Sequence, residues 1–348
     1  MEENMNMQKP EHDFSGIEST LIDGIASGLF MESVRVKLFD IMESPVTPDQ
    51  ISRHIPLDKA VLQALLDFLE VRKLIVNSDN RYVNSPLTAE FLVSSSPFYQ
   101  GNILEMQEQI GDSACSAMRA FLRDQRIRND KSNYGKKESS AGNMNFLLGP
   151  AQFAMRGTLQ DAVAFIVDLP QFMSAKKMCD IGGNHGHYTT ALLERNPSLS
   201  AVIADVPKIT GLIGPGFQNS DYRDRISVLP FDLRRDTLPE QSYDLVLTSF
   251  LLHMFADNLH EVVKKIGDSL RSGGVFVTQN LDSGSQYGCQ EEKTVRELMT
   301  KMLGYPTHYL DQELLEDVLR EAGFADYKVQ RTGSDKSSYI LAAVKQHC

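Results

Sequence analysis

Residues 179–193, CDIGGNHGHYTTALL, join a short apolar run to an amphipathic one through a turn that contains three glycines. The residues leading into the turn, KMCDI, have the apolar pattern of a buried strand, and HYTTALLER after it has the spacing of a helix. Glycines in such a turn allow positive φ and let a ligand lie against bare backbone. The stretch therefore predicts a ligand site at the carboxyl end of a strand.

Strand-like and helical segments alternate after this turn. Strands are expected within residues 200–207, 224–233, 242–252 and 273–281, and helices within 187–197, 259–273 and 310–324. This alternation predicts an α/β fold with a Rossmann-like, doubly wound parallel sheet covered by helices on both faces. Residues 326–333 and 337–345 predict a C-terminal antiparallel hairpin.

The first half of the chain has mainly helical patterns. Residues 17–42 carry apolar side chains at three- and four-residue spacing, and two more helices are expected after the N-caps Thr47 and Asp58. Residues 75–86 hold two short strand-like pieces about a polar turn. Helix, short helix, helix and a two-stranded wing is the order of elements in a winged helix.

Winged helices often bind DNA, but the charge of this region argues against it. Residues 1–100 hold 8 Lys and Arg against 15 Asp and Glu, and the whole chain carries a net charge of −11. Binding to nucleic acid requires a basic surface that displaces counterions. We therefore predict no nucleic-acid partner and assign the N-terminal helices to dimerisation.

Other features of the composition exclude further classes. Four scattered cysteines without CxxC spacing argue against disulfides or a zinc site and predict a cytoplasmic location. No run of about 18 apolar residues is present, so no membrane span is expected. His185, His187, His253 and His260 have no carboxylate spaced to complete a cluster, so no metal site is predicted.

The residues around the glycine turn distinguish its ligand from a dinucleotide. GGNHG is not the GxGxxG that brings a pyrophosphate to a helix N-terminus. Asp180, before the turn, would repel a phosphate but suits a cationic amino-acid ligand. Asp205, at the end of the next strand, is placed to accept both hydroxyls of a ribose. These features favour S-adenosylmethionine, which has a ribose, an ammonium and a sulfonium but no phosphate.

From about residue 17 to 345 the chain resembles the plant- and bacterial-type small-molecule O-methyltransferases, which include caffeate and acetylserotonin methyltransferases. DIGGNHG (180–186) resembles the first motif of the family, with Asn184 where a third glycine is usual. ADVP (204–207) resembles its ribose-binding segment, and FDL (231–233) the segment that flanks the adenine. LLHMF (251–255) resembles the segment that carries the general base. The resemblance implies a winged-helix dimerisation region followed by a class I methyltransferase domain.

The resemblance also implies site residues. It assigns the following residues to S-adenosylmethionine: Asp180, Gly182, Gly183, Gly186, Asp205, Asp232, Leu233 and Ser249. It makes His253 the catalytic base, and an imidazole with a pKa near 6.5 can take a proton from a phenol or an enol. Such a base predicts a rate that rises with pH through roughly 6–7.

The chain departs from the family's pattern around His253. Met254 and Phe255 stand where Asp-Trp is usual, and Asn280 and Tyr309 stand where the family has acids that orient the histidine. An asparagine can hydrogen-bond an imidazole, but it cannot stabilise an imidazolium as a carboxylate does. Acceptors that need no strong base therefore stay open: an acidic phenol or enol, a thioether or thiolate, or a carbon nucleophile.

Four residues are assigned to the substrate pocket: Met155, Arg156, Asn280 and Tyr309. Arg156 is placed either to receive a substrate carboxylate or at the surface. The predicted domains are a frayed N-terminus at 1–15, a helical winged-helix dimerisation and lid domain at 16–168, and a methyltransferase domain at 169–348. A homodimer is expected through the N-terminal helices, with these residues at its interface: Leu29, Phe30, Val34, Leu38 and Phe39.

The sequence thus predicts an S-adenosylmethionine-dependent enzyme that methylates a small molecule, with a hydroxyl oxygen as the favoured acceptor. Methylation of sulfur or carbon is one alternative. A homologue that binds S-adenosylmethionine without transferring its methyl group is another.

Overall fold

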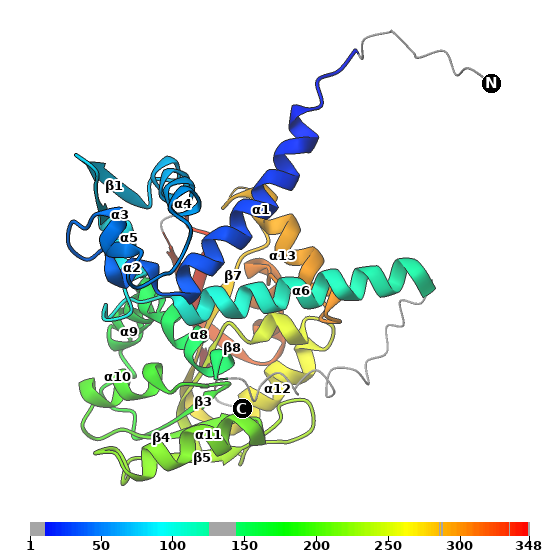
Figure 1. Cartoon of the computed structure of the whole chain (residues 1–348). Helices are drawn as coiled ribbons and strands as arrows, with labels where there is room; N and C mark the ends of the chain where they lie inside the picture. Colours follow the sequence, from blue (N-terminus) through cyan, green and yellow to red (C-terminus); the bar gives the residue numbers. More distant parts are fainter. Residues whose placement is uncertain (1–10, 125–143, 285, 287, 334, 347–348) are drawn as a thin grey trace. The chain divides into compact units, whose positions relative to one another are not determined.

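The computed structural model describes residues 11–124, 144–284, 286, 288–333 and 335–346. It divides into two compact units, one up to Leu104 and one from Glu105 onward, and each has its own hydrophobic core (Figure 1). Residues 1–10 of the predicted frayed N-terminus lie outside the described residues. The domain boundary at residue 168 stays a prediction.

The first unit consists of helices and one small antiparallel sheet. Its elements are α1 (Ser15–Arg35), α2 (Leu38–Ile41), α3 (Pro48–Ile51), α4 (Lys59–Val71), β1 (Ile75–Ser78), β2 (Arg81–Asn84) and α5 (Pro86–Phe91). Both predicted N-caps are present. Thr47 and Gln50 form a reciprocal capping box at α3, and the Asp58 carboxylate accepts a hydrogen bond of 2.8 Å from the Ala60 N–H at α4. These caps satisfy N–H groups that the helices leave unpaired, so the sequence determines where both helices begin.

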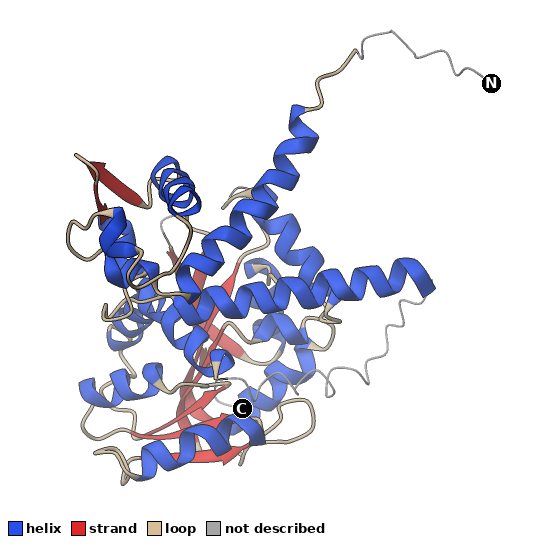
Figure 2. Ribbon diagram, in the orientation of Figure 1, coloured by secondary structure: helices blue, strands red, loops and turns tan. Residues whose placement is uncertain are grey.

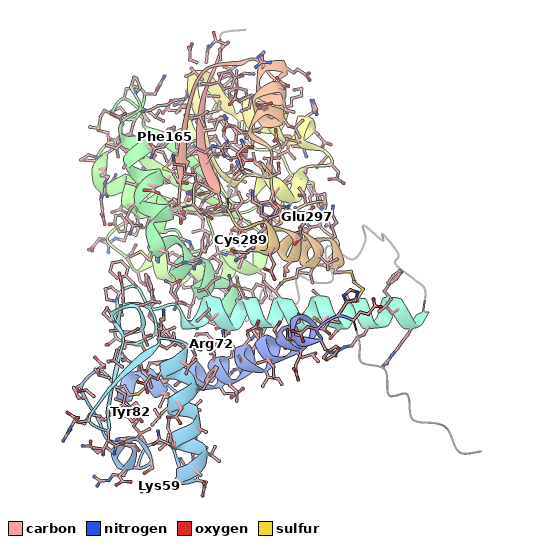
Figure 3. The ribbon with its side chains drawn as sticks, turned by 90° about the horizontal axis from the view of Figure 1, so that it is seen from above. Lys59, Arg72, Tyr82, Phe165, Cys289 and Glu297 are labelled. Atoms are coloured by element: carbon pink, nitrogen blue, oxygen red, sulfur yellow. The ribbon has the colours of Figure 1, made fainter. Side chains whose placement is uncertain are left out.

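The core of this unit buries residues that the sequence assigned to a dimer interface. Leu38 and Phe39 are fully buried and Val34 nearly so, in one cluster with α4 and the small sheet. Their prediction as interface residues is wrong, because their own unit already covers them. Arg72 lies just after the end of α4 (Figure 3) and donates a hydrogen bond of 3.0 Å to Asp23 of α1.

Helix α1 instead exposes a different apolar face. The side chains on it are 47–67% exposed and recur mostly every three or four residues: Phe14, Ile17, Leu21, Ile22, Ile25 and Leu29. Of the predicted interface residues, only Leu29 belongs to this face.

The second unit is built on one seven-stranded sheet (Figure 2). Its strands are β3 (Lys177–Ile181), β4 (Ser200–Asp205), β5 (Ile226–Pro230), β6 (Tyr243–Ser249), β7 (Leu270–Leu281), β8 (Phe324–Thr332) and β9 (Ser338–Lys345). The strand order is β5-β4-β3-β6-β7-β9-β8. The first five strands are parallel, and β9 is antiparallel to both β7 and β8. The predicted parallel sheet with a C-terminal antiparallel hairpin is confirmed.

Helices cover both faces of this sheet. The helices of this unit are α8 (Asn145–Phe153), α9 (Leu159–Val167), α10 (His187–Arg195), α11 (Pro207–Gln218), α12 (Leu259–Ser269), α13 (Gln290–Met302) and α14 (Gln312–Glu321). Helix α6 (Gly101–Asp124) begins in the first unit, which ends at Leu104. One core cluster joins the sheet to α9, α10 and α11, and the other joins it to α12 and α14. The chain runs from β3 out to β5 and then crosses back to β6, so the strand order reverses between β3 and β6. In open α/β sheets the ligand crevice lies at the carboxyl ends of the strands at such a switch.

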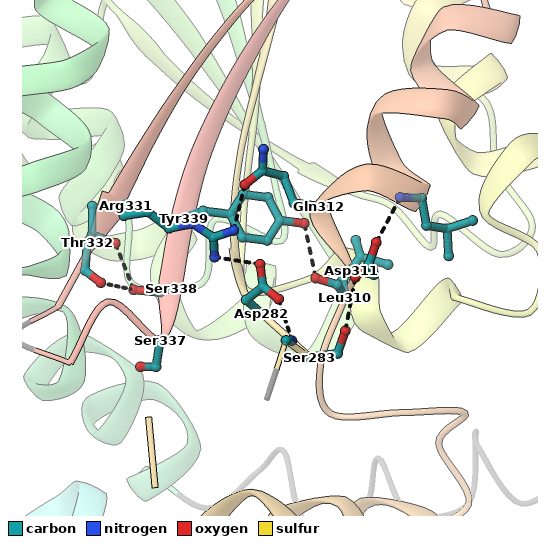
Figure 4. A network of polar contacts seen from close by, with 12 residues as sticks. Asp282, Ser283, Leu310, Asp311, Gln312, Arg331, Thr332, Ser337, Ser338 and Tyr339 are labelled. Atoms are coloured by element: carbon teal, nitrogen blue, oxygen red, sulfur yellow. Dashed lines mark hydrogen bonds and ion pairs between the residues drawn. The ribbon is translucent and has the colours of Figure 1, made fainter. Parts of the chain in front are cut away.

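Hydrogen bonds connect the C-terminal hairpin to the end of β7. Arg331 of β8 bonds to Asp282, which directly follows β7, and to Gln312 of α14 (Figure 4). The Tyr339 hydroxyl of β9 donates to the Leu310 carbonyl over 3.2 Å. These contacts fix the segment just before α14, which lies beside the site described below. Within the described residues, no helix is both long and apolar enough to span a membrane.

Candidate active site

A cavity of about 520 Å³ opens at the carboxyl ends of β3, β4, β5 and β6. Pockets of this size suit a cofactor or another small molecule. It is lined by Ile181, Gly182, Ala204, Asp205, Val206, Phe231, Asp232, Leu233, Arg234, Arg235, Leu251, Met254, Phe255, Asp257, Asn258 and Tyr305. Four of the predicted cofactor residues are among them: Gly182, Asp205, Asp232 and Leu233.

The glycine turn needs its glycines for two reasons. Gly182 and Gly186 have φ of +72° and +74°, which side-chain-bearing residues rarely adopt. A Cβ on Gly183 would lie 2.8 Å from the Asp180 carboxyl carbon, and one on Gly186 would lie 2.5 Å from the Phe217 ring. Gly182 lines the cavity, whereas Gly183 and Gly186 shape the turn by allowing this close packing.

Asp205 faces the cavity with a carboxylate that the backbone orients. Its Oδ2 accepts the Asn184 N–H over 2.9 Å, and its Oδ1 accepts the Val206 N–H over 2.7 Å. Burial raises the pKa of Asp205 above its usual value, although these two bonds oppose the effect. A carboxylate has about four acceptor positions, so Asp205 can still accept two hydroxyl groups from a ligand.

Asp180 lies behind the turn instead of in the cavity. Its side chain is 1% exposed, and it accepts a hydrogen bond of 2.7 Å from the Thr189 hydroxyl of α10. Burial raises the pKa of Asp180 to about 7 against the effect of the Thr189 bond, and the charge of Asp205 raises it further. In this structure Asp180 supports the turn and α10, and it is not among the cavity-lining residues.

The raised pKa of Asp180 predicts a stability that depends on pH. Because the folded-state pKa of about 7 exceeds the unfolded value near 3.8, the folded chain holds the proton more tightly between these values. The free energy of unfolding should therefore fall as pH rises from about 4 to 7, by up to about 4 kcal/mol from this group. Asp180→Asn keeps an acceptor for Thr189 without a charge and should remove this component. Denaturant titrations from pH 4 to 8 measure it, and equal slopes for the two proteins would contradict the assignment.

The segment after β5 provides an acid and two apolar walls. Phe231 and Leu233 are each 5% exposed and line the cavity. The Asp232 carboxylate accepts a hydrogen bond of 2.8 Å from the Arg234 guanidinium. Burial acts to raise the pKa of Asp232, but the bonds and charge of Arg234 outweigh it and leave that pKa below its usual value. Asp232 is therefore a charged acceptor at neutral pH.

Ser249 ends β6 and joins a polar network outside the lining of the cavity. Its hydroxyl donates to the Gln279 Oε1 over 3.2 Å, and the Tyr188 hydroxyl donates to the same atom over 3.2 Å. The Gln279 Nε2 donates in turn to the Thr158 carbonyl over 3.3 Å. This network ties β6, β7 and α10 to the turn that carries Met155 and Arg156.

His253 lies on a short 3-10 turn, Leu252–Phe255, that follows β6. The turn's neighbours Leu251, Met254 and Phe255 line the cavity, while the His253 ring, half-buried, faces the ring of His308 at a centroid distance of 5.6 Å. Burial first and the charge of His308 second lower the pKa of His253 to about 3, and the charge of Glu297 opposes both. The imidazole is therefore neutral at physiological pH and free of a bound proton on one nitrogen.

His308 and Glu297 are site residues that the sequence analysis missed. Glu297 lies on α13 (Figure 3) and accepts the His308 backbone N–H over 2.8 Å. No motif marks either residue, and they lie 55 and 44 positions from His253 in the chain. The one available signal is the position of His308 directly before Tyr309, which the sequence analysis assigned to the pocket.

Asn280 and Tyr309 do not take over the role of the family's acids, which is to orient the catalytic histidine. Asn280 is 1% exposed, and its Nδ2 donates to Thr278 over 3.0 Å instead of to an imidazole. Tyr309 is 8% exposed, packs edge-on against the His308 ring at 5.0 Å, and has its pKa raised to about 12, chiefly by burial. Tyr309 thus buttresses His308 and stays protonated at neutral pH.

Met155 and Arg156 lie on a π-helical turn, Ala154–Thr158, between α8 and α9. Such turns are rare and often occur at functional sites. The exposed Arg156 guanidinium stacks on Phe153 at 4.6 Å, and Phe153 packs edge-on against Phe250 at 5.4 Å. Phe250 directly follows β6, so this aromatic pair places Arg156 at the same end of the sheet as His253. Met155 packs partly buried against the core cluster of α9 and α10.

The other histidines singled out in the sequence have structural contacts. The His185 Nδ1 accepts the His187 N–H over 3.1 Å at the start of α10. His260 is exposed and lies 3.1 Å from the Glu321 carboxylate. Among the described residues, no group of three or more His, Cys, Asp or Glu side chains is arranged to hold a metal ion.

Comparisons with known proteins identify the family. The family profile described as O-methyltransferase domain matches residues 152–325, half of the chain. The 3-hydroxy-5-methyl-1-naphthoate 3-O-methyltransferase of Streptomyces sahachiroi is 23% identical over 335 residues, covering 94% of this chain and 95% of that protein. The N,N-dimethyltransferase OxyT of Streptomyces rimosus is 21% identical over 326 residues, covering 90% and 91%.

Solved structures agree on the fold. The crystal structure of human N-acetylserotonin methyltransferase in complex with SAM superposes with a TM-score of 0.77 at 17% identity, covering 99% of this chain and 100% of that one. The predicted resemblance and fold class are thereby confirmed. The bare glycine turn, the two free acceptor positions of Asp205 and the apolar walls at Phe231 and Leu233 fit an adenosine-bearing cofactor. The chain belongs to the O-methyltransferase domain family and is an enzyme that uses S-adenosylmethionine to methylate a small molecule.

Proposed function

We propose that the enzyme methylates a hydroxyl oxygen of an acidic aromatic or enolic small molecule, with His253 as the base that takes its proton. S-adenosylmethionine supplies a methyl carbon already activated by a sulfonium, so the chain mainly positions the acceptor and removes its proton. The observation that carries the proposal is the neutral His253 ring, on the turn whose neighbours Leu251 and Met254 line the cavity. A base of low pKa works best on an acidic hydroxyl, because the free energy of proton transfer to the base is then less unfavourable.

The residues proposed to hold the cofactor follow from the lining of the cavity. Asp205 would accept the ribose hydroxyls, and Gly182 would let the ligand approach the backbone. Phe231 and Leu233 would cover the adenine, with Asp232 as an acceptor beside it. Ser249 and Asp180 would support the site from outside the cavity. Ser249 does so through its hydrogen bond to Gln279, and Asp180 through its hydrogen bond with Thr189.

Methylation of nitrogen, sulfur or carbon is the second candidate. One relative is named an N,N-dimethyltransferase. The carboxylate whose charge acts on His253, that of Glu297, accepts its hydrogen bond from the His308 backbone N–H. An acceptor that loses no proton before the transition state would need no base. This candidate differs from the first in the atom that carries the new methyl group.

The test uses S-adenosylmethionine labelled with ¹³C in its methyl group and a hydroxynaphthoate as probe, since one relative is named for such a substrate. Carbon NMR of the product distinguishes a methoxy carbon from a methyl on nitrogen, sulfur or ring carbon. The proposal expects a methoxy product, and no product from the matched naphthoate whose hydroxyl is already methylated. A ring-methylated product from both probes would establish the second candidate instead.

We also infer a cytoplasmic homodimer with a winged-helix dimerisation region. The order of α1 to α4 followed by the β1-β2 sheet supports the winged helix, and the unpaired Cys115, Cys179 and Cys289 support the reducing compartment. The exposed apolar face of α1 supports a second copy as its partner, because monomers rarely expose such a stripe and two-fold dimers are the commonest oligomers.

Charges on this face should separate the subunits. Leu21→Glu combined with Ile25→Glu places two carboxylates in a surface that we propose is buried against its copy, which is strongly unfavourable. Light scattering at micromolar concentration should give a dimer for the natural chain and a monomer for the variant. Val71→Glu, at an 80% exposed position on α4, is the control that should remain dimeric. A single-chain mass for the natural chain would contradict the dimer.

A further inference from the structure

We propose that His308 is a positioning residue for His253, and that the two imidazoles share the proton taken from the acceptor. The inference rests on the proposed function. As the acceptor oxygen bonds to the methyl carbon, the bond from that carbon to the sulfonium sulfur breaks and S-adenosylhomocysteine leaves. The O–H bond of the acceptor breaks, and an N–H bond forms on His253. The His308 Nε2 lone pair accepts a hydrogen bond from the other nitrogen of that charged ring. The proton later leaves to solvent, so one proton is taken up and one released.

The two rings come from distant segments that the fold brings together. His253 lies on the turn after β6, and His308 lies in the segment between α13 and α14. Their centroids are 5.6 Å apart with ring planes 51° apart. The proposal requires the His253 ring to rotate about its broad χ2 torsion so that one of its nitrogens faces the His308 ring.

His308 is held in place through both its side chain and its backbone. Its Nδ1 lies 3.0 Å from the Thr300 hydroxyl, and Thr300 is 8% exposed on α13. Its backbone N–H donates to Glu297, which also accepts the Thr307 hydroxyl over 3.0 Å. If the Nδ1–H donates to Thr300, the Nε2 lone pair is left as the acceptor. The proposal requires this tautomer, in which the Thr300 hydroxyl accepts from Nδ1.

The charged side chains around the pair are engaged in ion pairs and hydrogen bonds of their own. The two imidazoles are therefore the groups that can accept the proton. The charges that act on His253 come from His308 and Glu297, and those that act on His308 come from Arg296, Glu297 and Glu292. Arg296 is paired with Glu292, and Glu297 with Lys301 over 3.0 Å. Glu297 adds a nearby negative charge, but its carboxylate accepts hydrogen bonds from the His308 backbone N–H and the Thr307 hydroxyl.

The electrostatics of the pair agree with one shared proton. Burial, with Arg296 second, lowers the pKa of His308 to about 4, so both rings are neutral at pH 7. The repulsion between them applies when both carry a proton. With a single proton, the neutral ring accepts from the charged one and stabilises it, so the pair titrates in two separate steps.

The first test is an NMR titration of the histidine side chains in the full chain with S-adenosylhomocysteine added. His308→Phe keeps a flat ring but removes the acceptor, so the pKa of His253 should fall. A rise would mean that His308 acts only as a repelling neighbour, and would overturn the proposal. Nitrogen shifts should also show the His308 proton on Nδ1, and Thr300→Val should abolish that preference. A proton on Nε2 in the natural chain would equally overturn it.

The second test is kinetic and uses the hydroxynaphthoate probe. His308→Phe should lower kcat about ten- to hundredfold with little change in the KM for S-adenosylmethionine, because one hydrogen bond to a charged group is lost. His260→Gln, which alters an exposed histidine, is the matched control and should leave kcat and the His253 titration unchanged. An unchanged kcat in His308→Phe would contradict the inference. If the natural chain methylates no hydroxyl probe, the proposed function fails instead, and the NMR titration still decides whether the pair shares a proton.

Discussion

Replacing His253 by alanine is expected to lower kcat by about 10²–10⁴-fold while leaving the affinity for S-adenosylmethionine intact. The loss has this size because a positioned base contributes that much to proton removal. The affinity is retained because His253 is not among the residues that line the cavity, so the substitution leaves that lining intact. Initial rates with the labelled cofactor measure kcat, and calorimetry measures the affinity. His260→Ala, on an exposed histidine of the next helix, should have the rate of the natural chain. A near-normal rate for His253→Ala would end the assignment of this residue as the base.

The pH dependence of the natural enzyme follows from the same residue. The sequence predicts a rise in rate through roughly pH 6–7, whereas burial in the structure lowers the pKa of His253 to about 3. A base with this pKa is already deprotonated above about pH 5, so the rate should be flat from there to neutral pH and fall only in acid. A sigmoidal rise centred near 6.5 would show that the pKa of the ring is not lowered and would contradict the pairing with His308.

Replacing Asp205 by alanine is expected to weaken S-adenosylmethionine binding by at least about tenfold. Two hydrogen bonds from ribose hydroxyls to a charged group are lost, each contributing about 1.5–3 kcal/mol. The substitution also frees the Asn184 N–H, which Asp205 holds in the glycine turn. Asp205→Asn keeps one acceptor oxygen and should fall between the two proteins in affinity. Calorimetry that showed the same affinity for the natural chain and Asp205→Ala would place the ribose elsewhere.

Much of the fold is readable from local sequence signals. Most of the parallel strands contain a run of buried apolar residues, such as AVIA in β4 and LVL in β6, because strands buried on both faces leave little polar alternation. The caps at Thr47 and Asp58 are found where side-chain acceptors precede a helical pattern. These features depend on residues within a few positions of each other, so no knowledge of the tertiary structure is needed.

What the sequence misses depends on contacts between distant segments. Asp180 is next to the glycine turn in sequence, yet strand alternation and Thr189 turn its carboxyl away from the cavity. The partner of His253 comes from 55 residues further along, and no periodicity or motif records that contact. On α1 and α2 an apolar residue has the same pattern whether its own unit or a second chain covers it. The sequence therefore assigned Leu38 and Phe39 to an interface, although they belong to the core.

A crystal structure of the full chain grown with saturating S-adenosylhomocysteine tests the central claim most directly, because that claim is the place where the cofactor binds. The account predicts the ligand in the cavity at the carboxyl ends of β3 to β6, against Gly182, with both ribose hydroxyls within hydrogen-bond distance of the Asp205 carboxylate. The sulfur should point toward the side of the cavity where Met254 and the His253 turn lie. A ligand bound at any other place, or with its ribose away from Asp205, would contradict the account.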